Sequence, residues 1–436
     1  MSAAGDGAYD EYHALLARQD ARRLRRRLLS PPGPSDPVRA AAGSAGPGGA
    51  GRPYDGCADR RTIHRYLPLV TPFSDLITHL YEAMFEQHPY LRGLFPDSMD
   101  FQRAHLERAF WYLIEHLDQP HEVTAFCARL GRDHRKLGVR PVHFEVFETA
   151  LAEALRRSAG GRRVEEMERA WLRMVRYAVT AMVDGAEARL AEPAYWNATV
   201  TGHHLRAPDL AVLRVRTSEP FPYRAGQYTS IQSPRLPHAW RPYSMARAPH
   251  RDGELEFHVR RAGPGGVSEA LVKHTRVGDR LRLGPAQGTT TLDDVLTRDV
   301  LIVAGGTGWA TAKALLEELA TRRPPGRGAH LFLGARTADD LYDTAALAEL
   351  EERCPWLRVV PVIGEDPGPA GGLAVADAVT RHGDWSACLA YVSGPPDVVT
   401  PAVRALAAMN LPADRIRHDP VGGMVPRPLQ PALHGL

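Results

Sequence analysis

A glycine-rich stretch in the second half of the chain is the first place where residue types and spacing point to chemistry. Residues 304–311 read AGGTGWAT, follow the apolar run DVLIV and precede a helical pattern. Glycines permit a tight turn and the close approach of a phosphate, and the helix beyond them offers unpaired N–H groups. Residues 393–397, SGPPD, end a later apolar run, and ligands of open α/β sheets bind beyond the carboxyl ends of the strands. We therefore predict that the two loops line one dinucleotide-binding crevice. The simpler alternative is that both are only tight turns. Its predicted lining is Gly305, Gly306, Thr307, Gly308, Thr311, Ser393, Gly394 and Pro395.

Two four-residue pieces in the middle of the chain could hold a second, flatter ligand. In RPYS, Arg241 can hold a pyrophosphate, the Tyr243 ring can pack against a flat ring, and the Ser244 hydroxyl can reach one of its nitrogens. The piece GGVS begins a predicted helix whose N-terminus can take a second phosphate contact. Read singly, each piece is weak, and a tyrosine such as Tyr243 is more often a core aromatic. The second piece comprises Gly265, Gly266, Val267 and Ser268.

The first half of the chain contributes one histidine of interest. His134, in LGRDHRKLGVRP, shares an apolar stripe with Phe126 and Leu130 near the end of a predicted helix. A single histidine on such a face is usually a satisfied core or rim residue. The position nevertheless provides what a haem iron needs, namely one imidazole nitrogen projecting into an apolar slot while an acceptor orients the other.

Two polar side chains on neighbouring predicted helices need partners. Tyr81 and Gln102 lie on otherwise apolar, core-facing segments. Burying an unpaired hydroxyl or amide costs about 1–3 kcal/mol. A bound ligand would supply the partner, and a backbone carbonyl is the alternative.

Three kinds of segment must position these residues. Apolar residues recur at helical spacing from about residue 60 to residue 192, which predicts an all-helical domain. Short alternating runs separated by turn residues follow and predict a small antiparallel β-barrel. From residue 299 buried strands alternate with helices, which predicts a parallel α/β sheet. The predicted division is a tail at 1–58, domains at 59–192, 193–297 and 298–421, and a second tail at 422–436.

Composition narrows the class of protein. The chain has 54 basic and 51 acidic residues, a balance of +3, which argues against a dedicated nucleic-acid site. The four cysteines are scattered and form no CxxC pair. The sequence contains no run of 18 apolar residues, so no membrane span is predicted. The first residues lack a secretory pattern, so a cytoplasmic enzyme is expected. Residues 31–56 are rich in glycine and proline and predicted to be disordered, and the preceding Arg-rich run at 22–27 has no identifiable partner.

The pieces beyond residue 193 occur in a familiar order. GQY (226–228), RPYS, GGVS, GGTG, GARTADDLYD (334–343) and SGPPD resemble the ferredoxin–NADP reductase superfamily. That resemblance implies that Tyr228, Arg241, Tyr243 and Ser244 contact FAD, and that residues 306–311 and 393–395 contact NAD(P)H. Thr311 replaces the usual proline and Ser393 the usual cysteine, which should tune the placement of the nicotinamide. Arg336 leaves the choice between NADH and NADPH open.

The helical segment resembles the globin domain of flavohaemoglobins. LYEAMFEQHPYLRGLFPDSMDFQRAHL and HRKLGVRPVHF carry the likeness. It implies that His134 ligates the iron of haem b and that Phe95 packs on the porphyrin. It also implies that Tyr81 and Gln102 hydrogen-bond dioxygen, while Leu106 gates the pocket.

The chain also departs from that family at three positions. Phe144 stands where flavohaemoglobins carry a proximal tyrosine, and Glu187 lies one residue from the expected glutamate. The electron push on the iron should therefore be weaker. Val421 stands where the family has an aromatic residue over the flavin.

The resemblance as a whole implies a nitric oxide dioxygenase, in which electrons pass from NAD(P)H through FAD to haem and nitric oxide and dioxygen become nitrate. One alternative is a reductase whose globin serves peroxide chemistry or another acceptor, as Phe144 suggests. A second is a non-catalytic gas or redox sensor with the Arg-rich tail as its output. A third is that the helical domain has lost haem.

Overall fold

The computed structural model describes residues 56–364 and 371–419 and divides the chain into two compact units at Ala194 and Tyr195. The predicted tail at 22–27 and 31–55, Val421 and the tail at 422–436 lie outside the described residues. The first described helix begins at Cys57, so the last two residues of the predicted N-terminal tail, 57 and 58, are helical. Among the described helices, none combines the length and the hydropathy that crossing a membrane requires.

The first unit is helical, as predicted. It consists of α3 (Cys57–Tyr66), α4 (Phe73–Gln87), α5 (Asp100–His116), α6 (Pro120–His134), α7 (Pro141–Ser158) and α8 (Glu165–Glu187), with a short 3-10 helix at Pro89–Leu94. Pro120 and Pro141 occupy first turns, where the missing N–H costs nothing. Gly138 adopts φ 71° just after His134, so the chain turns sharply between α6 and α7.

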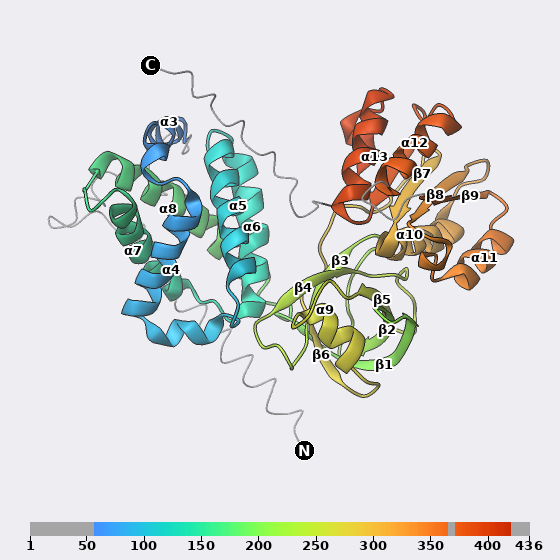
Figure 1. Ribbon diagram of the computed structural model, residues 1–436, viewed down its shortest axis with the longest axis horizontal. Coiled ribbons are helices and arrows are strands. Elements are labelled where there is room, and N and C mark those ends of the chain that lie inside the picture. The colour runs from blue at the N-terminus through green and yellow to red at the C-terminus, as the bar shows by residue number, and fades with distance from the viewer. Residues whose placement is uncertain (1–55, 365–370, 420–436) are drawn as a thin grey trace. The chain divides into compact units, whose positions relative to one another are not determined.

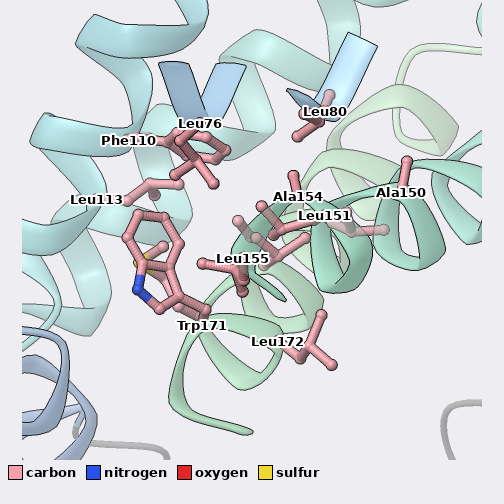
Figure 2. Close-up of a cluster of buried hydrophobic side chains, with 14 of the residues drawn as sticks. Leu76, Leu80, Phe110, Leu113, Ala150, Leu151, Ala154, Leu155, Trp171 and Leu172 are labelled. Carbon is pink, nitrogen blue, oxygen red and sulfur yellow. The ribbon is translucent and has the colours of Figure 1, made fainter. Parts of the chain in front are cut away.

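The core of the helical unit is built from four helices. Figure 2 shows side chains of α4, α5, α7 and α8 converging on one apolar cluster, with Trp171 and Phe110 among the largest. The Trp171 and Phe110 rings meet edge to face, with their centroids 5.3 Å apart. Such a cluster removes a large apolar area from water and fixes the angles between the helices.

Helices α6 and α8 approach so closely that their backbones touch. A Cβ atom placed on Gly131 would lie 1.9 Å from the Met182 carbonyl oxygen, and one on Gly185 would lie 2.3 Å from the Ala128 carbonyl oxygen. Only glycine permits this contact. Because Gly131 lies three residues before His134, the crossing sets the position of the histidine.

We predict that Gly131→Ala lowers the free energy of unfolding of the helical unit by about 1–3 kcal/mol, because the new methyl group must push two backbones apart. Urea denaturation followed by circular dichroism measures this change. Gly93→Ala is the matched control, since its new Cβ would meet no atom within 4 Å, and it should stay within about 0.5 kcal/mol of the wild type. Equal stability of the two variants would contradict the close crossing.

The second unit begins with a six-stranded antiparallel sheet. Its strands are β1 (Trp196–Ala207), β2 (Leu210–Thr217), β3 (Tyr228–Gln232), β4 (Trp240–Ser244), β5 (Glu254–Arg260) and β6 (Arg280–Leu283), in the order β4-β3-β6-β1-β2-β5. A bridge between Met245 and Phe257 joins the two ends of that order, so the sheet curls into the predicted barrel. The strands β1, β4 and β6 were not among the alternating runs that the sequence pattern singled out.

The rest of the second unit is a five-stranded parallel sheet in the order β11-β10-β7-β8-β9. Its elements are β7 (Val300–Gly305), α10 (Trp309–Arg322), β8 (Ala329–Ala335), α11 (Thr344–Arg353), β9 (Leu357–Ile363), α12 (Gly371–His382), β10 (Leu389–Ser393), α13 (Pro396–Ala408) and β11 (Ile416–Arg417). Alternate residues of β7 enter two separate apolar clusters, one with α10 and α11 and the other with α12 and α13. Helices therefore cover both faces of the sheet (Figure 1), as expected of a parallel sheet.

Candidate functional site

His134 is the last residue of α6, and one of its ring nitrogens is already engaged. Its Nδ1 lies 2.8 Å from the Leu130 carbonyl oxygen, one helical turn earlier. Since a carbonyl only accepts, Nδ1 carries the proton and the Nε2 lone pair remains available. Burial lowers the pKa of His134, so the ring is neutral at pH 7. A neutral imidazole held by its second nitrogen is the form that ligates iron.

Two polar side chains of the same helical unit were predicted to contact a ligand, and one of them has a buried atom without a hydrogen-bond partner. The Gln102 Oε1 atom on α5 is buried and accepts no hydrogen bond from the described residues. Tyr81 on α4 is 7% exposed, and burial raises its pKa to about 12, so its hydroxyl stays protonated and able to donate. Amide oxygen and nitrogen are assigned from hydrogen bonding, so the atom at the Oε1 position can equally be the donating NH₂. Both residues therefore fit a small ligand that accepts hydrogen bonds.

Aromatic side chains lie beside the Tyr81 ring. The Phe95 ring meets the Tyr81 ring edge to face at 5.6 Å and the Phe85 ring at 5.4 Å. Phe95 and Leu106 pack against the helical core but remain partly exposed. Half-covered apolar side chains, an unpaired polar atom and a neutral, oriented histidine together fit a haem group.

Two of the three departures from the family, Phe144 and Glu187, lie among the described residues. Phe144 lies in the first turns of α7 and packs against the core, and its side chain has no polar atom. Glu187 is the last residue of α8. The acceptor found for His134 is the neutral Leu130 carbonyl. A neutral acceptor makes the imidazole a weaker electron donor than a carboxylate partner would.

The residues predicted to bind FAD meet on two paired strands of the barrel. Tyr228 on β3 lies opposite Ser244 on β4, and Tyr243 lies opposite Thr229 in the same register. Arg241 donates from Nη1 to the Trp240 carbonyl oxygen at 2.8 Å, and burial lowers its pKa. Directly opposite residues project to the same face, so Tyr228 and Ser244 share one face of the strand pair, whereas Arg241 and Tyr243 project to the other.

The GGVS turn, which was predicted to bind a phosphate, has an open backbone, but the helix that follows it is shorter than predicted. Gly265 adopts φ 73°, and Cβ atoms on Gly265 or Gly266 would meet nothing within 4 Å, so the backbone forms an open cradle. That openness fits a pyrophosphate. The following helix, α9 (Val267–Glu269), is shorter than predicted and continues as a π-helix. The Gly265 N–H donates to Glu269 Oε2 at 2.7 Å, and the Ser268 hydroxyl accepts from the Ala262 N–H at 3.1 Å.

The two turns predicted to bind the nucleotide are in direct contact. Strands β7 and β10 are parallel neighbours, so residues 305–308 and 393–395 follow adjacent carboxyl ends. The Ser393 hydroxyl donates to the Gly308 carbonyl oxygen at 2.9 Å, and a Cβ on Gly308 would lie 2.3 Å from the Ser393 carbonyl oxygen. Gly306 has φ 53° and open space around it. The structure thus brings both turns to one edge of the sheet, where a nucleotide phosphate fits.

The remaining residues predicted for this crevice lie in the same two turns. Thr307 belongs to the glycine turn, and Thr311 is buried in the first turn of α10. Gly394 has φ 141°, a conformation that suits glycine, and a Cβ there would lie 2.9 Å from the Gly305 carbonyl oxygen. Pro395 is the N-cap of α13.

One residue at the barrel was missed by the sequence patterns. Asp419, which follows β11, returns to the barrel and accepts from the Thr289 N–H at 3.1 Å. A Cβ on Gly288 would lie 2.9 Å from the Asp419 carboxylate and 3.1 Å from the Tyr228 ring. Burial raises the pKa of Asp419. No local pattern could have found it, because 130 residues separate Asp419 from Thr289.

Comparison with known proteins agrees with this organisation. The globin family model matches residues 78–182, the oxidoreductase FAD-binding domain matches residues 197–291, and the oxidoreductase NAD-binding domain matches residues 302–404. A flavohemoglobin from Malassezia yamatoensis, solved with bound FAD and heme, shares the fold over 83% of this chain and 98% of its own. Its TM-score is 0.67 and its sequence identity 17%.

Curated relatives match the second unit. The reductase component DmpP of phenol 2-monooxygenase from Pseudomonas sp. strain CF600 is 31% identical over 46% of this chain and 58% of its own. The ferredoxin–NAD(P)(+) reductase component of the naphthalene 1,2-dioxygenase system from Pseudomonas putida is 34% identical over 48% and 64%. Reductase component 1 of terephthalate 1,2-dioxygenase from Comamonas sp. is 32% identical over 51% and 67%. The chain thus spans only about three fifths of the first two relatives.

The two units of the chain match different domain families. The second unit belongs with FAD- and NAD-binding reductases, and the helical unit that precedes it is a globin domain, the domain that holds haem. The chain therefore combines a globin domain with an FAD- and NAD-binding reductase, in the order and architecture of a flavohaemoglobin.

Proposed function

We propose that this protein is an NAD(P)H-dependent nitric oxide dioxygenase. Two molecules of nitric oxide and two of dioxygen would be consumed for each NAD(P)H, giving two nitrates, NAD(P)⁺ and one proton. The observation that carries the proposal is the buried, unpartnered Gln102 amide, together with the buried Tyr81 side chain, in the unit that contains a neutral, oriented His134. A globin built only to pass electrons onward needs no such polar groups.

Each cofactor would supply a distinct part of the chemistry. NAD(P)H supplies a hydride, FAD converts it into single electrons, and haem supplies the iron at which dioxygen and nitric oxide react. The residues of this chain would bind and orient these groups. His134 would hold the iron through Nε2, and Phe95 and Leu106 would exclude water from the haem.

The remaining roles belong to polar side chains. The Tyr81 hydroxyl and the Gln102 amide would donate hydrogen bonds to the ligand as negative charge develops on it. Arg241 would neutralise the pyrophosphate of FAD, and the amides of the turn at 305–308 would hold that of the nucleotide. We propose the cytoplasm as its location, because all four cysteines are free thiols, which fits a reducing compartment.

The decisive experiment measures nitrate formed per NAD(P)H oxidised by the purified holoprotein under nitric oxide and air. The proposal expects a ratio near two, and NADH and NADPH are tested in parallel because Arg336 does not separate them. A nitrate yield no higher than that of a protein-free control, with NAD(P)H oxidation continuing, would overturn it.

Continued NAD(P)H oxidation without nitrate formation would support a different reductase function. Phe144 and the neutral acceptor of His134 both weaken the electron push on the iron. We therefore keep as the second candidate a reductase whose globin domain serves peroxide chemistry or another electron acceptor. Peroxide consumption by the reduced protein, without nitrate formation, would identify it.

The unpartnered amide of Gln102 allows a test with effects of opposite sign. Gln102→Leu removes a buried, unsatisfied polar atom, so the free energy of unfolding of the ligand-free helical unit should rise by about 1 kcal/mol. The same change removes a hydrogen bond to bound dioxygen, so the dioxygen dissociation rate should increase about tenfold. Urea denaturation and flash photolysis measure the two quantities.

The exposed Gln87 at the end of α4 provides the control for Gln102. Gln87→Leu should change neither the stability nor the dissociation rate. If Gln102→Leu destabilises the unit and leaves dioxygen dissociation unchanged, then Gln102 has a structural role only.

A further inference from the structure

A buried carboxylate joins the barrel to the helix that follows the glycine turn. Glu256 on β5 is 3% exposed. Its Oε1 accepts from Lys313 Nζ on α10 at 2.5 Å and from His258 Nε2 at 3.2 Å, and its Oε2 accepts from Arg214 Nε at 3.0 Å. Three donors on one buried carboxylate satisfy its charge and hold β5 and α10 together.

His258 extends this contact to a second element of the α/β part. Its side chain is fully buried, and its Nδ1 lies 2.8 Å from the Tyr342 hydroxyl. Glu256 can only accept, so the proton of the ring resides on Nε2 and the Tyr342 hydroxyl donates to Nδ1. The two rings meet edge to face, 5.5 Å apart at an interplanar angle of 78°. Both nitrogens are therefore used, and the orientation of the ring is fixed.

Tyr342 lies in the loop between a 3-10 helix, Ala338–Asp340, and α11. This loop lines a small pocket together with Gly306 of the glycine turn and Gly334 of β8. The pocket is thus at the carboxyl ends of β7 and β8, the edge at which open α/β sheets bind nucleotides. A nucleotide whose pyrophosphate lies on the turn at 305–308 would extend its adenosine over this loop.

The other polar contacts of the loop come from the same two directions. Asp340 accepts from Arg260 Nη2 of β5 at 3.1 Å, and Asp343 accepts from Trp309 Nε1 of α10 at 3.0 Å. Arg206 Nη2 of β1 also lies 3.7 Å from Asp343 Oδ1, so side chains of the barrel strands β1 and β5 and of α10 position the loop and the residues beside it. Among these contacts, the His258–Tyr342 hydrogen bond is the most buried link to the barrel.

We propose that His258 is a positioning residue for the pyridine nucleotide: through Tyr342 it holds the loop at 341–343 where the adenosine half of NAD(P)H docks. The barrel that binds the flavin would thereby shape the nucleotide site as well. Neither side chain is placed to touch the reacting ring atoms, so the pair affects binding of the nucleotide and leaves hydride transfer from bound nucleotide unchanged. This inference rests on the reductase activity of the function proposed above.

The test is Tyr342→Phe, which removes one oxygen atom and keeps the ring. Steady-state reduction of ferricyanide by the full-length holoprotein gives KM and kcat for NADH and NADPH. The KM of the better nucleotide should rise about fivefold to tenfold, as expected for one lost hydrogen bond, while kcat stays within about twofold. FAD content and the flavin absorption spectrum should not change. His258→Leu should raise KM similarly, and the double variant should be no worse than the poorer single variant, because both changes break the same bond.

A buried tyrosine elsewhere in the same unit provides the control. The Tyr223 hydroxyl donates to the Arg247 carbonyl oxygen at 3.0 Å, so Tyr223→Phe loses an equivalent bond. It should leave KM unchanged. The inference is overturned if Tyr342→Phe leaves KM unchanged, or if kcat and FAD content fall together in both tyrosine variants. Failure of the proposed reductase function is distinguishable, because then the wild-type flavin would not be reduced by either nucleotide.

Discussion

Replacing His134 by alanine should yield a protein without a Soret band that still contains FAD and still reduces ferricyanide with NAD(P)H. The imidazole is the residue proposed to hold the iron, and its loss leaves only apolar contacts with the porphyrin. Nitrate formation should fall at least about 100-fold, because the chemistry at the iron disappears while the reductase part remains intact. Absorption spectra and nitrate assays of the purified variant measure both effects.

His116 is a closely matched control for this change. It is the last residue of α5, it is half-buried, and its Nδ1 lies 2.9 Å from the Tyr112 carbonyl oxygen four residues earlier. His116→Ala thus loses the same local hydrogen bond as His134→Ala. It should retain the Soret band and nitrate formation. A full Soret band in His134→Ala would exclude this histidine as the iron ligand, and a wild-type protein with no Soret band after haem supply would show that the globin domain has lost haem.

Gly308→Ala should remove the reductase half of the activity instead. The added Cβ would lie 2.3 Å from the Ser393 carbonyl oxygen and 2.7 Å from the Gly394 Cα, so the two turns at the carboxyl ends of β7 and β10 must separate. Displacing a binding loop by about 1 Å can cost 100-fold in rate, so kcat/KM for flavin reduction should fall by about that factor. Stopped-flow mixing with NAD(P)H in the absence of oxygen measures it, and haem and FAD contents should match those of the wild type.

Gly328 lies at the opposite, amino-terminal end of β8 and serves as the control. A Cβ there would meet the Trp356 carbonyl oxygen at 3.6 Å, which is an ordinary contact. Gly328→Ala should reduce its flavin at the wild-type rate. If Gly308→Ala did so too, the close approach of the two turns would have no role in nucleotide binding.

The two variants also test the order of electron transfer. His134→Ala should keep NAD(P)H-dependent flavin reduction without nitrate formation, and Gly308→Ala should keep the haem without rapid reduction by NAD(P)H. Mixing the two purified variants should not restore nitrate formation if electrons pass between domains of one chain only. Restoration would indicate transfer between molecules.

Local patterns in the amino-acid sequence were sufficient to predict the kind and the order of the elements. Helical spacing in the first half, alternating runs in the middle and buried strands followed by helices at the end depend on local periodicity, which is visible in any window of the chain. His134 and the turn at 305–308 were found for the same reason, since the helix end and the glycines that position them lie within a few residues. The short strand β6 was missed because four residues carry little periodicity.

Contacts between distant residues were decided only by the tertiary structure. Asp419 reaches Thr289 across 130 residues, and His258 reaches Tyr342 across 84. Gly131 and Gly185 resemble ordinary helix-weakening glycines until the crossing of α6 and α8 shows that a side chain would collide with backbone. Likewise, the missing partner of the Gln102 amide becomes apparent only when all its neighbours are in place. These features arise from packing between segments, and a local pattern contains no information about which distant atoms will meet.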